Sequence, residues 1–257
     1  MIFVRLRKIL SISVRAPVRL FTLAAGVLLV AAALLAFSGG GLPPPSFKVS
    51  RSQGGIIPLH YPAWRTAGDW LTGRKYAVLT FDDGPYGGGV DEQILSILQR
   101  HHAPAIFFIV CNRLDSRTDH VLSEIVQAGH LIGNHSYDHP RLPQLNLADL
   151  QHQVEGCSER IANVTGRRPR YFRPPFGQTS LGVGQVVQSA GMGQVLWNAN
   201  SQDSWLTKPN QILYWSMEQT GNGSILLMHS KPTTAAALDR VLTELEGRGF
   251  RFVLPAT

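Results

Sequence analysis

From Lys75 to the C-terminus, short apolar runs alternate repeatedly with stretches of helical hydrophobic periodicity. Apolar side chains between the runs recur every three or four residues, as in the stripe formed by Leu238, Val241, Leu242 and Leu245. Such alternation predicts an α/β fold with parallel strands joined by crossover helices, whereas periodicity does not distinguish a doubly wound sheet from a barrel. The seven expected strands are 76–81, 105–110, 131–133, 170–173, 194–198, 224–228 and 250–254.

The chain before this α/β region has a different composition. We divide it into a basic tail (1–19), an apolar segment (20–37) and a Gly/Pro-rich linker (38–73), followed by the α/β domain (74–257). Segment 20–37 is uncharged, is about as long as a bilayer core requires, and follows five basic residues. It is expected to be an uncleaved transmembrane anchor or, alternatively, the apolar part of a signal peptide. The domain is therefore expected outside the cytoplasmic membrane, on a single-pass anchor, or secreted or periplasmic after cleavage.

The net charge of +7 belongs to this N-terminal part. Eight of the 24 basic residues and no acidic residue precede Asp69, so 16 basic and 17 acidic residues remain from there on, a net of −1. The domain carries no excess of positive charge that would attract a nucleic acid, and no obligatory protein partner is evident. Cys111 and Cys157 would lie in an oxidising compartment, where they could pair or remain two separate thiols.

Side chains with acid–base or metal-binding chemistry fall at the ends of the expected strands. In parallel α/β folds these strand ends open onto one face, where active sites assemble. Residues far apart in the sequence are thus expected to converge there. They are Asp82 and Asp83 after the first strand, His135 and His139 after the third, Arg173 at the fourth, Asp203 beyond the fifth and His229 at the sixth.

The two histidines after the third strand suggest a metal site. His135 and His139 are four residues apart and can face one ion if the segment makes a helical turn. Two imidazoles with a carboxylate suit zinc and leave a coordination position for water. On the residues alone, a pair of surface histidines and an Asp-rich turn are the alternative interpretations.

Three motifs together resemble the polysaccharide deacetylases, the family 4 carbohydrate esterases with a NodB homology domain. They are Thr80-Phe81-Asp82-Asp83-Gly84-Pro85, His135-Ser136-Tyr137-Asp138-His139 and Arg173-Pro174-Pro175-Phe176-Gly177. The resemblance extends from about Lys75 to Leu254. It implies a distorted (β/α) barrel with fewer strands than the eight of a regular one, which suits the seven expected here.

The resemblance also implies a role for each matching residue. Asp82 would be the general base, oriented by Arg173, and His229 the general acid, partnered by Asp203. The backbone N–H of Phe176 would donate to the oxyanion, and Leu227 and Trp205 would form the acetyl pocket. Asn200 and Ser204 depart from the pattern of the family around Asp203. The implied metal ligands are Asp83, His135 and His139.

The function expected from these observations is metal-dependent removal of N-acetyl groups from a sugar polymer or oligosaccharide. Peptidoglycan, chitin-like oligomers and exopolysaccharides are all compatible substrates. The expected cofactor is a divalent metal, with zinc as the first choice and cobalt as an alternative. Competing hypotheses are hydrolysis of another acyl group, as by an O-acetyl esterase or a deformylase, and an inactive carbohydrate-binding domain.

Overall fold

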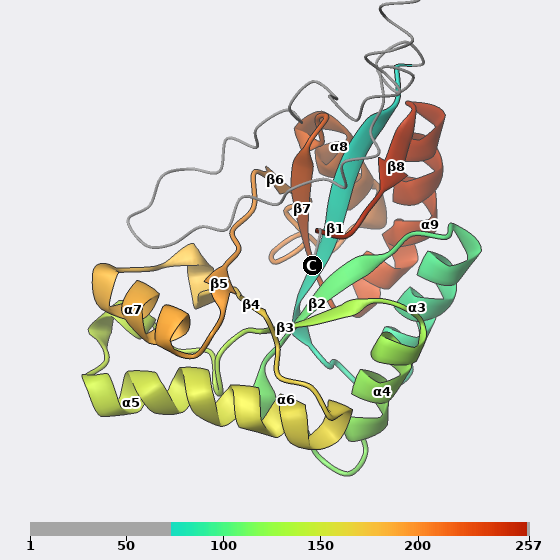
Figure 1. Cartoon of the computed structure of the whole chain (residues 1–257). Coiled ribbons are helices and arrows are strands. Elements are labelled where there is room, and N and C mark those ends of the chain that lie inside the picture. The colour runs from blue at the N-terminus through green and yellow to red at the C-terminus, as the bar shows by residue number, and fades with distance from the viewer. Residues whose placement is uncertain (1–72, 256–257) are drawn as a thin grey trace, which may run out of the picture. The chain divides into compact units, whose positions relative to one another are not determined.

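A computed structural model of the chain describes residues 73–255, which form an eight-stranded sheet flanked by helices (Figure 1). All strand pairs are parallel, and the order is β5-β4-β3-β2-β1-β7-β6, with β8 also beside β1. The α/β class with parallel strands is thereby confirmed. The strands are β1 (Lys75–Gly84), β2 (Ala105–Ile109), β3 (Leu131–Asn134), β4 (Tyr171–Phe172), β5 (Gly193–Gln194), β6 (Ala199–Asn200), β7 (Ser224–His229) and β8 (Phe250–Phe252).

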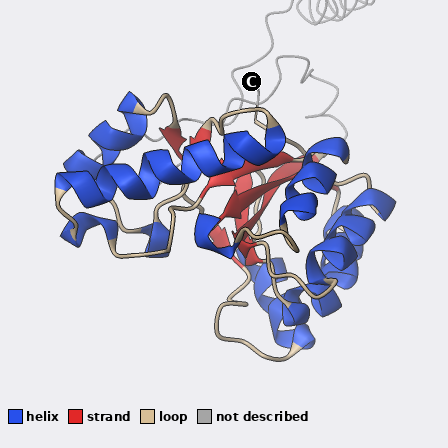
Figure 2. Ribbon diagram, turned by 90° about the horizontal axis from the view of Figure 1, so that it is seen from below, coloured by secondary structure: helices blue, strands red, loops and turns tan. Residues whose placement is uncertain are grey.

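Helices connect the strands and flank the sheet (Figure 2). The stripe of apolar residues Leu238, Val241, Leu242 and Leu245 noted in the sequence lies in α9. The helices are α3 (Val90–Arg100), α4 (Asp119–Gln127), α5 (Leu147–Gln151), α6 (Cys157–Thr165), α7 (Leu181–Ser189), α8 (Pro209–Gln219) and α9 (Pro232–Gly247). Short turns are η1 (Cys111–Arg113), η2 (Leu142–Gln144), the π-helical η3 (His152–Gly156) and η4 (Pro175–Gly177).

The expected strand 194–198 is wrong, because only Gln194 of this segment lies in a strand, β5, and the next strand, β6, begins at Ala199. β5 pairs with β4 at one edge, and β6 pairs with β7 at the other. Between them the carbonyls of Val195 and Leu196 accept hydrogen bonds from the guanidinium of Arg173 at 3.0 and 3.3 Å. These two carbonyls therefore bond to a side chain instead of to a neighbouring strand. Within residues 73–255 the sheet therefore has eight strands and stays open between β5 and β6, as in an incomplete barrel.

Side chains alternate between two apolar layers along β1. Ala77, Leu79 and Phe81 pack with the helices in the larger core, while Val78 packs in a second cluster with residues such as Ile225 of β7. This inner cluster lies on the same face of the sheet as Thr80 and Asp82, which follow Val78 at intervals of two along β1. The alternation therefore separates an outer structural core from an inner face that carries polar groups at the strand ends.

Cys111 and Cys157 form a disulfide between η1 and α6, with their Cα atoms 5.3 Å apart. This answers the question that the sequence left open, in favour of pairing.

The expected tail, apolar segment and nearly all of the linker lie outside the described residues. Among residues 73–255, no helix has the length and apolar character needed to span a bilayer.

Candidate active site and metal centre

The C-terminal end of β1 places two adjacent carboxylates at one site. Thr80 and Asp82 share the inner face of the strand, as their spacing of two requires. Asp83 would point to the opposite face of a regular strand, but the β1–β2 register shifts between Phe81 and Gly84, and Asp83 has a φ of 65°. The irregular backbone turns both acids toward His135, whose Nε2 lies 3.6 Å from Asp82 Oδ2 and 3.6 Å from Asp83 Oδ1.

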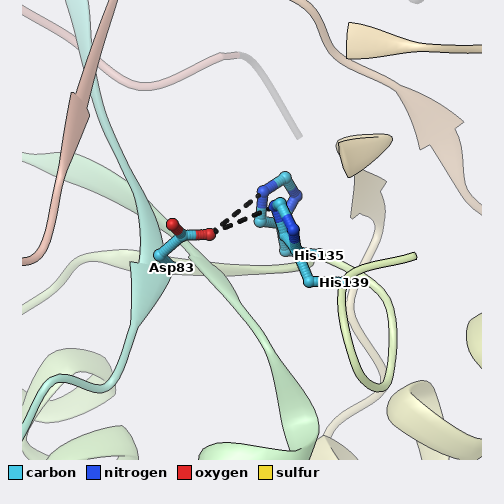
Figure 3. A group of neighbouring side chains, drawn as sticks. All are labelled: Asp83, His135 and His139. Atoms are coloured by element: carbon cyan, nitrogen blue, oxygen red, sulfur yellow. Dashed lines mark ion pairs between the residues drawn. The ribbon is translucent and has the colours of Figure 1, made fainter. Parts of the chain in front are cut away.

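Asp83, His135 and His139 converge on one point, as the sequence predicted (Figure 3). The Oδ1 atom of Asp83 lies 3.4 Å from His139 Nε2, and all three candidate ligand atoms lie within 4.8 Å of one another. Asp83 Oδ1 is shielded from solvent and accepts no hydrogen bond from the described residues. A shielded carboxylate oxygen facing two imidazole nitrogens is the arrangement that a divalent metal ion would satisfy.

The histidine segment does not form the helical turn that the spacing suggested. Residues 135–140 are non-helical, and Ser136 and His139 have positive φ values of 71° and 65°. The Ser136 hydroxyl accepts a hydrogen bond from the His139 N–H at 3.0 Å, and the Ser136 N–H donates to Asn134 Oδ1 at 2.8 Å. The two imidazoles therefore meet through a tight turn stabilised by side chains. Left-handed backbone at non-glycine residues is concentrated at functional sites in proteins.

The buried His135 is held in the tautomer that a metal ligand requires. Its Nδ1 lies 2.6 Å from the carbonyl oxygen of Arg173, so Nδ1 carries the proton and Nε2 keeps its lone pair. Burial lowers the pKa of His135 to about 3, which keeps the ring neutral at physiological pH. The tautomer, the neutral ring and the shielded Asp83 oxygen all fit a bound divalent metal ion.

Arg173 is fully buried and holds Asp82 in place. Its Nη1 donates to Asp82 Oδ1 at 2.8 Å and to Thr80 Oγ1 at 2.7 Å. Its guanidinium also lies 4.2 Å from the centre of the Phe108 ring. Burial raises the pKa of Asp82, although the positive charge of Arg173 opposes this shift. Asp82 Oδ1 is thus fixed, while Oδ2 faces the metal site.

His229 lies next to Asp82 in the β1–β7 pairing and forms a second polar pair with Asp203. His229 Nδ1 is 2.7 Å from Asp203 Oδ1, and the backbone N–H of His229 donates to Oδ2 at 2.7 Å. Burial alone would lower the pKa of His229, but the hydrogen bond and negative charge of Asp203, with the charges of Asp82 and Asp83, outweigh it and raise the pKa. The ring is thereby stabilised in its protonated form.

The three predicted substrate-binding residues have different surroundings. Leu227 is buried on β7, opposite Thr80 in the strand pairing. Phe176 lies at the metal site, with its ring centre 4.6 Å from that of His139, and has a φ of 58°. Trp205 is 67% exposed in the loop after Asp203. Asn200, at the departure from the family pattern, accepts a hydrogen bond from the Gln202 N–H at 2.7 Å.

Sequence reasoning assigned no role to three residues that support these groups. Thr80 links Arg173 to β7, because its hydroxyl donates to the Leu226 carbonyl at 2.8 Å. The hydroxyl of Thr234, at the start of α9, donates to Asp203 Oδ2, and Lys231 Nζ donates to the Asp203 carbonyl at 2.7 Å. Thr80 opens the first of the three motifs, which is a signal that could have revealed it. Thr234 and Lys231 had no comparable signal.

Comparison with known proteins identifies relatives of this arrangement. The family model described as polysaccharide deacetylase matches residues 71–195. A peptidoglycan-N-acetylglucosamine deacetylase PgdA of Listeria monocytogenes is 32% identical over 181 residues, which are 70% of this chain and only 38% of that protein.

Solved structures agree in fold. A family 4 carbohydrate esterase from Streptomyces lividans, in complex with acetate, is 31% identical, with 70% of this chain and 92% of that chain covered and a TM-score of 0.65. BA3943 of Bacillus anthracis, described as a pseudoenzyme of the same family, is 28% identical, with 70% and 63% covered and a TM-score of 0.65. The convergent motif residues and these matches show that the chain belongs to the polysaccharide deacetylase family, the family 4 carbohydrate esterases.

Proposed function

We propose that this protein hydrolyses N-acetyl groups of an N-acetylated sugar polymer or oligosaccharide with the help of a divalent metal ion. One observation carries the proposal: the Asp83–His135–His139 group is bordered by two proton-transfer candidates, Asp82 and His229. Amide hydrolysis needs a base to activate water and an acid to protonate the departing nitrogen. Both groups are present, and each has its own charged partner.

Zinc is the ion that this ligand set favours, with cobalt as an alternative, because two imidazoles and one carboxylate leave coordination positions open. When bound, the ion would supply Lewis acidity toward the amide carbonyl and the attacking water. Asp83, His135 and His139 would hold it, and the Arg173 carbonyl would keep His135 in the required tautomer.

Asp82 is the proposed general base. Arg173 holds Oδ1 through a hydrogen bond, so Oδ2, on the side of His135, is the atom that accepts the proton of the attacking water. Burial raises the pKa of Asp82 and so makes it a stronger base, although its pairing with Arg173 opposes this effect. The backbone N–H of Phe176 is proposed to donate to the developing oxyanion, as the family resemblance implies.

His229 is the proposed general acid. Its Nδ1 is engaged by Asp203, so the proton on Nε2 is the one that passes to the sugar nitrogen as the C–N bond breaks. Without this proton the leaving group would be an amine anion, which is far too basic to depart. Leu227 and Trp205 are proposed to line the pocket for the acetyl methyl group.

We also propose that the domain acts outside the cytoplasmic membrane, anchored through segment 20–37 or released after its cleavage. The composition of that segment and the Cys111–Cys157 disulfide support this location, because disulfides persist in oxidising compartments.

Acetate release by the full-length protein tests the proposal. Metal-stripped protein is supplied with N-acetylglucosamine oligomers or peptidoglycan, with and without zinc or cobalt, and formylated and O-acetylated substrates are run in parallel. Metal-restored acetate release from the N-acetylated substrates is the expected result. Release from the other substrates alone would reassign the acyl group. Binding of polysaccharide with metal present and no release would indicate a pseudoenzyme, as BA3943 is described.

A further inference from the structure

The turn η1, which follows β2, contacts the segment that carries both histidine ligands. The Cys111 N–H donates to the Ser136 carbonyl at 3.2 Å, and the Asn112 N–H donates to the Tyr137 carbonyl at 2.7 Å. Both acceptors lie between His135 and His139. The position of η1 therefore sets the position of the backbone that joins the two imidazoles.

The same turn also reaches the third candidate ligand. Arg113, the last residue of η1, donates a hydrogen bond from Nη1 to the backbone carbonyl of Asp83. A guanidinium bond to a carbonyl is stronger than a bond between neutral groups. The three residues of η1 thus contact main-chain atoms on both sides of the metal group.

A second element holds the histidine segment from its other side. Gln153, in the π-helical turn η3, accepts hydrogen bonds on Oε1 from the backbone N–H groups of Tyr137 and Asp138, at 3.0 and 3.1 Å. Asn134 Nδ2 donates to Ser158 Oγ on α6 at 2.9 Å, so the start of the segment is tied to the same helix. π-Helical turns within helices occur frequently at functional sites.

The disulfide joins these two holding elements to each other. Cys111 is the first residue of η1, and Cys157 is the first residue of α6, directly after η3. The histidine segment consequently lies between two elements that are covalently linked. We name η1, the disulfide and Gln153 together the clasp.

We propose that the Cys111–Cys157 disulfide and Arg113 are positioning groups for the metal site, and that removing either weakens metal binding. The inference rests on the proposed function only in taking Asp83, His135 and His139 as metal ligands. Neither group contacts the ion in this proposal. Each acts by keeping the ligand backbone in the metal-binding geometry before the ion arrives, which lowers the cost of ordering on binding.

Zinc affinity measured by competition with a chromophoric chelator tests the proposal directly, without relying on turnover. The full-length wild type is compared with a Cys111→Ala/Cys157→Ala double variant, which leaves no thiol that could bind zinc itself. A second comparison uses Arg113→Ala. Its matched control is Arg117→Ala, because Arg117 is an exposed arginine four residues further on that pairs only with Asp115 among the described residues.

The expected dissociation constant for zinc rises about 10- to 100-fold in the double variant and about tenfold in Arg113→Ala, the range seen when groups that support metal ligands are removed. Arg113→Lys, which can still donate to the carbonyl, is expected to recover part of the loss. Arg117→Ala is expected to bind zinc as the wild type does. Acetate release at saturating zinc should fall far less than the affinity does.

An unchanged zinc affinity in folded Arg113→Ala and in the double variant would overturn the proposal, even if the unfolding temperature of the metal-free double variant falls. If the double variant does not fold, the Arg113 and Arg117 variants decide. A wild type that binds no zinc would overturn this inference and the proposed function together. A wild type whose clasp variants bind zinc less tightly, but which releases no acetate, would contradict the proposed function alone.

Discussion

The two sides of the candidate site, the proposed metal side and the proposed proton-donor side, are stabilised in different ways. On the metal side, short contiguous segments carry the ligands, and hydrogen bonds to their main chain fix them, as those of Gln153 and η1 to the histidine segment do. On the donor side, the single residue His229 pairs with Asp203, 26 residues earlier in the chain, and Asp203 in turn accepts a hydrogen bond from Thr234 of α9. The candidate metal ligands are therefore positioned largely through hydrogen bonds to their main chain, whereas the proposed donor is positioned through the side chain of Asp203.

This difference makes the two sides separable by experiment. A change on the metal side should alter zinc affinity more than the chemistry at saturating zinc. A change on the donor side should alter the rate and its pH dependence and leave zinc affinity intact. Asp82 lies between the two sides and belongs functionally to neither, because it borders the ligands and pairs with Arg173.

Replacing Asp82 is expected to have the largest effect on turnover with metal still bound. Asp82→Asn keeps an oxygen for the Arg173 hydrogen bond but cannot accept a proton, so kcat should fall about 10²–10⁴-fold while zinc content is unchanged. Acetate release and metal analysis of the same preparation measure both quantities. The control is Asp138→Asn, an exposed carboxylate in the histidine segment, which should retain activity. Near-normal turnover of the zinc-loaded Asp82→Asn variant would show that another group is the base.

Replacing Asp203 tests the donor side. The pKa of His229 is raised because the hydrogen bond and charge of Asp203 outweigh the opposing effect of burial, so Asp203→Asn should lower it. A general acid acts only while protonated, and its activity is lost as pH rises through its pKa. The alkaline limb of the pH–rate profile should therefore move to lower pH, with kcat reduced roughly 10²-fold.

Zinc affinity of Asp203→Asn should match the wild type, and the exposed Asp149→Asn should leave the profile unchanged. An alkaline limb that stays in place would exclude His229 as the group that titrates there.

Removing the Gln153 side chain tests the metal side. Gln153→Ala deletes the acceptor for two N–H groups of the histidine segment, so the dissociation constant for zinc should rise about tenfold. At saturating zinc, kcat should stay close to that of the wild type, since Gln153 makes no hydrogen bond with Asp82 or His229 among the described residues. Gln151→Ala, an exposed glutamine on the same helix, is the matched control. A loss of kcat with unchanged zinc affinity would contradict the assignment of Gln153 to the metal side.

The smallest effect is expected at Trp205. Because its side chain is 67% exposed, Trp205→Ala should leave the folded structure intact and raise KM roughly two- to tenfold through loss of aromatic contact with substrate. Trp215→Ala on α8 serves as a control for the loss of an exposed indole. Substrate titrations separate KM from kcat. A fall in kcat at constant KM would instead place Trp205 with the donor, next to its neighbour Asp203.

The sequence predicted part of this arrangement. The approximate positions of the strands other than 194–198 were predicted correctly, and so was the convergence of Asp82, Asp83, His135 and His139, because alternating apolar runs locate the edge of a parallel sheet. The helical turn suggested by the spacing of the two histidines does not form, because Asn134 and Ser136 stabilise a tight turn that no periodicity indicates.

Other features depended on contacts that only the folded chain brings together. The prediction of a strand at 194–198 was wrong, because the buried guanidinium of Arg173 donates hydrogen bonds to two carbonyls of this segment. The pairing of Cys111 with Cys157 could not be predicted, because nothing in the sequence gives the distance between them. Thr234 could not be recognised, because its role exists only once the start of α9 packs against Asp203.

The double role of Arg173 limits how far the metal preference of this protein can be changed by itself. Its side chain holds Asp82, the proposed proton acceptor, and its own carbonyl sets the tautomer of His135, a proposed metal ligand. A displacement of Arg173 would therefore change both the basicity of His135 and the position of Asp82. On the proposed roles, ion preference and proton transfer depend on the position of this one residue. A variant selected for a different metal by shifts at Arg173 should therefore also show an altered acid limb in its pH profile.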